Sequence, residues 1–109
     1  MVDATHYSYR VLWSEEDQEF VGLCAEFPSL SHLDRDQAST LAGIVALVTD
    51  VVSDMKAAGE AAPTPIADRH YSGKFQVRTT PDLHRRLALQ AAEANVSLNR
   101  IINDQLAKR

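Results

Sequence analysis

The chain has 109 residues, of which 45% are hydrophobic and 24% charged, and this length holds one ordinary domain or two very small ones. Its uninterrupted apolar runs are far shorter than the roughly 20 residues of a membrane span, so we expect no membrane role. The first residues lack the segments of a secretory signal and the single Cys24 cannot form an internal disulfide, which predicts a cytoplasmic protein.

Charge is unevenly distributed along the sequence, although the net charge is only −4. Up to Asp68 there are twelve acidic residues against three basic ones, a net charge of −9. From Arg69 onward eight basic residues face three acidic ones, a net charge of +5. Opposite signs on the two halves predict two partners, one basic and one polyanionic.

The N-terminal half begins with a pattern of short strands. Apolar residues alternate with other residues over 7–13, which predicts a half-buried strand. The polar segment 15–19 predicts a hairpin turn, because a second apolar stretch follows at 20–25. Pro28 ends that strand, and residues 30–33 supply a short third one.

A long helix should follow over residues 37–58, with Asp36 as N-cap and Gly59 as the left-handed C-cap residue. Spacings of three and four predict a core-facing stripe of Ala38, Leu41, Ala42, Val45, Val48, Val52 and Met55. A second stripe beside it consists of Ile44, Leu47 and Val51. This wide apolar face leaves two readings open, a fully packed core or contact with another subunit or partner.

The segment Glu-Ala-Ala-Pro-Thr-Pro over residues 60–65 cannot continue the helix, because proline lacks the backbone donor and stiffens the chain. We therefore predict an N-terminal domain over residues 1–62, a linker over 63–72 and a C-terminal domain over 73–109.

The C-terminal domain opens with an amphipathic segment, in which Phe75 and Val77 point to one face of a short strand. Paired antiparallel with its copy from a second chain, such a strand forms a ribbon narrow enough for the major groove. Side chains on its other face then meet base edges, where arginine and lysine suit guanine and glutamine suits adenine. The predicted base-reading residues are Lys74, Gln76 and Arg78.

Two helices should follow this strand. Thr80 and Pro81 predict the start of the first helix, which ends near Asn95. Ser97 caps the second, so Ser97 and the amides of Leu98 and Asn99 form a predicted phosphate-binding site. Strand and helices are too small to make a core alone, which predicts a homodimer. Its predicted core residues are Phe75, Val77, Leu87, Ile101 and Ile102.

This order of amphipathic strand, Thr-Pro helix start, helix, short turn and Ser-capped helix resembles the ribbon-helix-helix (β-α-α) fold of the Arc and MetJ type. The resemblance covers Lys74 to about Lys108. It implies a dimeric transcriptional repressor that binds operator DNA through the outward face of the ribbon. The sequence leaves open whether dimers pair further into tetramers.

The N-terminal half resembles the HicB antitoxin family. The resemblance rests on a first strand ending in Trp13, a second reading Phe-Val-Gly-Leu-Cys-Ala-Glu-Phe-Pro, and Asp34-Arg35-Asp36-Gln37-Ala38 before a helix. It implies an α+β protein in which a β-β-β-α, partial RNase H-like domain precedes the ribbon-helix-helix domain. It also implies that this domain neutralises a basic, HicA-type mRNA-cleaving toxin of a type II toxin-antitoxin system. Ser29-Leu30 departs from the usual Gly-Cys of the family.

The sequence is compatible with one other class of protein and not with a second. A stand-alone ribbon-helix-helix regulator, with an N-terminal domain that binds a small ligand or another protein, would also fit the sequence. An enzyme would not, because the acidic residues of segment 15–19 lie in a turn, Asp34 and Asp36 precede a helix as caps, and the four histidines lack ligand spacing. We therefore expect no catalysis, no metal and no cofactor.

Overall fold

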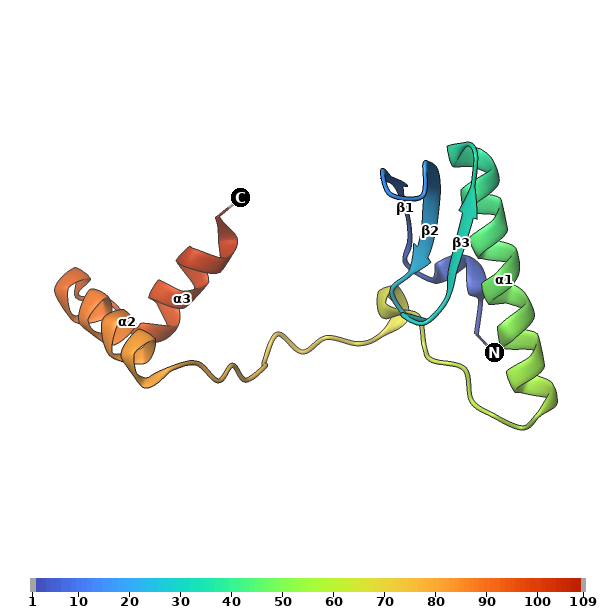
Figure 1. The fold of residues 1–109 in the computed structure, drawn as a ribbon. Coiled ribbons are helices and arrows are strands. Elements are labelled where there is room, and N and C mark those ends of the chain that lie inside the picture. Colours follow the sequence, from blue (N-terminus) through green and yellow to red (C-terminus); the bar gives the residue numbers. More distant parts are fainter. Residues whose placement is uncertain (1, 109) are drawn as a thin grey trace. The chain divides into compact units, whose positions relative to one another are not determined.

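The computed structural model describes residues 2–108. The chain divides between Tyr71 and Ser72 into two compact parts, called here unit 1 and unit 2. Unit 1 holds a three-stranded antiparallel sheet and one long helix, and unit 2 holds two helices, as Figure 1 shows. The fold class is therefore α+β, as predicted.

The sheet of unit 1 is a simple meander. Strands β1 (Tyr9–Ser14), β2 (Glu19–Cys24) and β3 (Ser31–Asp34) pair in chain order, and a single turn of 3-10 helix, η1 (Ala4–His6), precedes them. Both predicted connections are present, because the acidic segment turns the chain between β1 and β2 and Pro28 lies between β2 and β3. The three predicted strands are confirmed.

Helix α1 (Gln37–Ala57) packs against one face of the sheet, alongside the strands, and has the predicted ends. The Asp36 carboxylate accepts a hydrogen bond from the Ser39 amide at 2.8 Å, and this bond lowers the pKa of Asp36. Gly59, just beyond the helix, has φ +76°, a conformation that glycine adopts without steric cost. The predicted helix 37–58 is confirmed to within one residue.

The predicted core stripe of α1 is wrong in its first half. Ile44 and Val48 are fully buried against the sheet, whereas Leu41 is 45% exposed and Ala38 and Ala42 also face outward. The reason is Thr40, which is buried because its hydroxyl donates to the Asp36 carbonyl at 2.6 Å. Because a polar threonine occupies the first buried position of α1, a pattern based on hydrophobic residues does not identify this part of the buried face.

Helix α1 is also long and apolar for a helix of this small unit. Uninterrupted apolar runs are short, but averaged over its length α1 is apolar enough to cross a membrane. Small polar residues such as Thr49 and Ser53 interrupt the runs without lowering the average much. A core helix of a soluble protein passes the same test, and α1 contributes Ile44 and Val48 to the core of unit 1.

The segment 63–71, called here the arm, differs from the predicted linker 63–72 because it packs on the rest of unit 1 and belongs to it. The Tyr7 hydroxyl donates to the Pro63 carbonyl at 2.8 Å, and the Pro65 side chain is fully buried. The Ile66 amide donates to the Glu26 carboxylate at 2.9 Å. A single turn of 3-10 helix, η2 (Ile66–Asp68), follows. The proline-rich composition of the arm predicted a free linker. The contacts that hold the arm come from residues far away in the sequence, so local composition could not reveal them.

Unit 2 is a pair of helices with little interior of its own. Helix α2 (Pro81–Ala94) and helix α3 (Leu98–Ala107) pack on each other, and Asn95 between them has φ 55°. Within the described part of unit 2, Ala91 is the one buried residue. One buried residue is far less than a stable domain needs, so unit 2 requires a further surface to pack against.

Candidate nucleic-acid interface

Residues 74–80 run extended into α2 and form no strand in the single chain. A strand needs a hydrogen-bonded neighbour, and the predicted neighbour is the same segment of a second chain. Phe75 is 76% exposed and Val77 68% exposed, which is unfavourable for large apolar side chains in water. The predicted dimer-core residues of the strand are therefore uncovered in one chain.

The three predicted base-reading side chains are Lys74, Gln76 and Arg78, and all of them are exposed. They alternate with Phe75 and Val77, so an extended backbone places them on the opposite face. Gly73, with φ +87°, turns the chain just before this segment, and the Lys74 amide donates to the Ser72 hydroxyl at 3.1 Å. The segment therefore has a polar, cationic face that no described residue covers.

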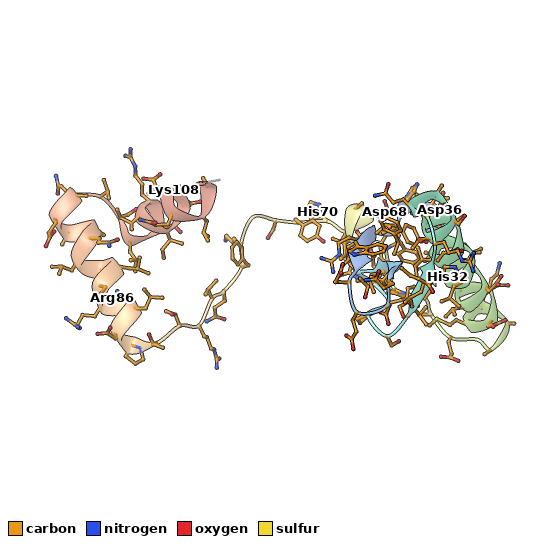
Figure 2. The ribbon with its side chains drawn as sticks, turned by 45° about the horizontal axis from the view of Figure 1, so that its top comes forward. His32, Asp36, Asp68, His70, Arg86 and Lys108 are labelled. Carbon is orange, nitrogen blue, oxygen red and sulfur yellow. The ribbon has the colours of Figure 1, made fainter. Side chains whose placement is uncertain are left out.

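Helix α2 begins with the predicted cap. The Thr80 hydroxyl accepts a hydrogen bond from the Leu83 amide at 3.2 Å, and Pro81 occupies the first helical position. Asp82 in the first turn pairs with Arg85 at 2.7 Å and with Arg86 at 3.6 Å. All three side chains are exposed, so these ion pairs are weak and salt-sensitive. Figure 2 labels Arg86 on α2.

The start of α3 also has the predicted cap. The Ser97 hydroxyl accepts a hydrogen bond from the Arg100 amide at 3.0 Å. The first amides of a helix have no acceptor within the helix, so those of Leu98 and Asn99 are directed beyond its N-terminus. This arrangement suits a phosphate oxygen because the positive end of the helix dipole lies at the same place.

Between α2, α3 and the extended segment lies an open groove of about 700 Å³. Of the predicted dimer core, Val77, Leu87 and Ile102 line it, while Phe75 and Ile101 do not. The predicted set missed three apolar residues in the lining, namely Leu83, Leu98 and Leu106. Leu83 lies four residues before Leu87, and Leu98 and Leu106 each lie four residues from Ile102, and this spacing was the available signal. The groove and the exposed segment thus form one continuous uncovered surface.

The charge of unit 2 matches a polyanion. Residues 72–109 hold seven basic and three acidic residues, a net charge of +4. The bases come from the extended segment, from α2, from Arg100 near the start of α3 and from the residues after α3, where Figure 2 labels Lys108. Phosphate contacts from such residues supply affinity for nucleic acid without reading sequence, and side chains such as Arg78 can add base recognition.

Comparison with known proteins gives one match. Residues 57–106, which are 50 of the 109 residues, match the HicB family. The matched stretch begins at the end of α1 and includes the arm, the extended segment and nearly all of both helices of unit 2. No curated protein and no solved structure matches the chain. The match at residues 57–106 supports a HicB-family protein.

Proposed function

We propose that the chain is an antitoxin of the HicB family that neutralises a basic, HicA-type mRNA-cleaving toxin and represses its own operon. In this proposal unit 1 is the partial RNase H-like, toxin-binding domain. Unit 2 is one half of a ribbon-helix-helix dimer that binds operator DNA. The protein acts in the cytoplasm by binding, without catalysis, cofactor or membrane contact. Pairing of dimers into tetramers is compatible with this arrangement.

The uncovered surface of unit 2 is the observation that carries the proposal. A single chain exposes Phe75 and Val77 and leaves an apolar groove between its helices. A second copy related by a two-fold axis would pair the extended segments and fill both grooves with the facing helices. Such pairing would bury the exposed apolar side chains and the groove of both copies in one interface.

Pairing of this kind also explains the alternation in the extended segment. With Phe75 and Val77 in the dimer core, Lys74, Gln76 and Arg78 of both copies lie together on the outer face of a two-stranded ribbon. Two such sets give forked donors for guanine and an amide for adenine in each half-site. The Ser97-capped amides of Leu98 and Asn99 then hold the flanking phosphates.

The N-terminal part of the proposal rests on charge and on the resemblance of its strands to the HicB family, because the family match covers only residues 57–71 of unit 1. Unit 1 holds twelve acidic and four basic residues, a net charge of −8, which repels nucleic acid and attracts a basic protein. A toxin that cleaves mRNA must bind a polyanion and is therefore basic.

The test is a mobility-shift experiment on DNA upstream of the gene. The full chain should shift this DNA at lower concentration than a scrambled duplex. The purified basic product of the adjacent reading frame should bind the chain and change the shift. Failure to discriminate between the two duplexes would contradict the repressor function, and failure to bind the adjacent product would contradict the antitoxin function.

One observation favours a second candidate function, a stand-alone regulator. The family match starts at residue 57, so it leaves the sheet of unit 1 unmatched. In that case unit 1 would bind a small ligand or another protein, and the adjacent gene product would not bind the chain while specific DNA binding persisted.

A further inference from the structure

The sheet of unit 1 has one face that α1 leaves uncovered. A Cβ added at Gly22 would lie 2.9 Å from Ile44 Cγ2, so Gly22 faces α1. Cys24, two residues further along β2, is buried in the same core as Ile44. Successive side chains in a strand point to opposite faces, so Val21 and Leu23 belong to the other face. This surface is called here the open face.

Apolar side chains cross the open face from one edge of the sheet to the other. Leu12 of β1 is directly opposite Val21, and Leu33 of β3 is opposite Val21 on its other side. Leu12 is 39% exposed and Leu33 40% exposed. The three side chains Leu12, Val21 and Leu33 are called here the apolar row. A solvated face of an antiparallel sheet is ordinarily polar, so an aliphatic row on this face is a recognisable anomaly.

Acidic residues gather at the end of the sheet next to the apolar row. Ser14 pairs with Glu19 and Phe20 pairs with Asp34, so the β1–β2 turn and the start of α1 lie at the same end, as Figure 1 shows. The acidic residues at this end are Glu15, Glu16, Asp17, Glu19, Asp34 and Asp36, and the basic residue among them is Arg35. The apolar row thus has a strongly negative rim on one side.

We propose that the apolar row is the docking surface for a basic protein. The matching surface of that protein has aliphatic side chains at its centre. This inference rests on the proposed antitoxin function and assigns the surface that the toxin covers. Burial of the apolar row supplies affinity, and the acidic end attracts and orients the partner. A second copy of unit 1 fits less well, because it would bring another set of acidic residues and a second charge of −8 against this end.

The first test compares two leucines of similar exposure in the full-length chain. Leu33 lies in the apolar row, and Leu41, 45% exposed, lies on α1. The probe is the purified basic product of the adjacent reading frame. Leu33→Ser and Leu12→Ser should each weaken its binding by roughly tenfold or more, and Leu41→Ser should leave binding unchanged. Thermal unfolding and operator binding of each variant report whether the fold is retained.

The second test addresses the acidic rim with two variants of equal charge change. Glu16 lies in the β1–β2 turn and Asp50 on the exposed side of α1. At low salt Glu16→Lys should lower the association rate several-fold, whereas Asp50→Lys should change it little. A salt titration should remove the difference between the two variants.

The outcomes separate this inference from the proposed function. If the wild-type chain binds the probe and the Leu33→Ser and Leu12→Ser chains, still folded, bind it equally well, the docking surface is overturned and the antitoxin function stands. The surface is also overturned if Leu41→Ser weakens binding as much as Leu33→Ser. If the wild-type chain does not bind the probe, the antitoxin function fails and the docking surface with it.

Discussion

Arg78 and Ser97 are assigned to two different kinds of DNA contact, and single substitutions separate them. Arg78 lies on the exposed polar face of the extended segment and can donate two parallel hydrogen bonds to a guanine. Arg78→Ala should weaken operator binding by about 1–3 kcal/mol and relax discrimination at one base pair in each half-site. Titration of operator and scrambled duplexes at fixed salt measures both effects. Equal losses on both duplexes would mean that Arg78 contacts only the DNA backbone.

Ser97 contributes through the helix that it caps. Its hydroxyl accepts the Arg100 amide at 3.0 Å and fixes the first turn of α3, including the Leu98 and Asn99 amides. Ser97→Ala should therefore weaken binding to operator and scrambled DNA together and lower the free energy of unfolding by about 1 kcal/mol. Ser97→Asp retains a cap but adds a negative charge near the phosphate, so it should keep the stability and still weaken DNA binding. A sequence-specific loss in either variant would contradict a phosphate role.

His6 gives the arm a dependence on pH. Its Nδ1 lies 2.8 Å from Oδ2 of Asp68, and Asp3 lies 3.4 Å from its Nε2. The hydrogen bond and the charge of Asp68 raise the pKa of His6 above its ordinary value of about 6.5. Because the pKa is raised in the folded state, the attachment is strongest below that ordinary value and weakens as pH rises through the raised pKa.

This pH dependence is measurable by NMR titration of the His6 ring. Asp68→Asn should lower the His6 titration midpoint, and proteolysis within the arm should become faster at acidic pH than in the wild type. Asp104→Asn in unit 2 is the matched control and should leave the His6 midpoint unchanged. A midpoint that is unaffected by Asp68→Asn would show that the two side chains do not interact in solution.

Among the elements, the groove of unit 2 is the surface that the proposed dimer would fill. Leu87 lines it, whereas Leu89 on the same helix is exposed and lies outside the lining. If a second copy fills the groove, Leu87→Ala should cost about 2–5 kcal/mol of dimer stability and Leu89→Ala much less. Sedimentation equilibrium across a concentration series measures the two dissociation constants. A folded wild-type monomer at micromolar concentration would contradict the dimer directly.

The elements that the sequence predicted well are those with local causes. Asp36, Thr80 and Ser97 each accept the amide three residues ahead, and Gly59 and Asn95 each have positive φ. Caps and left-handed residues depend on the neighbouring few residues, so their identity is sufficient to predict them. The starts of all three α-helices and the C-terminal ends of α1 and α2 were predictable for this reason.

The features that the sequence did not predict depend on distant partners. The buried side of α1 is centred on Ile44 because Thr40 satisfies its hydroxyl within the helix. The arm lies on unit 1 because Tyr7 and Glu26 bind it from 56 and 40 residues away. The candidate strand at 74–78 needs a partner that a single chain does not supply. In the candidate site, the exposed polar positions could be predicted from the sequence. The residues that line the groove could be predicted only in part.

At the scale of the whole molecule, the arm determines where the chain can be cut. A fragment ending at Tyr71 keeps the Pro63 carbonyl for the Tyr7 hydroxyl and keeps Pro65 buried. A fragment ending at Ala62 loses both, so it should be less stable by at least about 1–3 kcal/mol, the cost of one partly buried donor without an acceptor. Urea unfolding of the two fragments measures this difference. Equal stabilities would show that the arm does not stabilise unit 1.

The same attachment shortens the tether between the two proposed binding sites of one chain. Nine residues, 72–80, lie between the end of the arm and the start of α2. Fully extended they reach roughly 30 Å, whereas a chain free from residue 63 would reach about 60 Å. A shorter tether raises the effective concentration of whatever each end holds. If unit 1 captures a protein and unit 2 binds DNA as proposed, the short tether would keep that protein near the DNA, so occupancy of one unit would affect the other at the promoter.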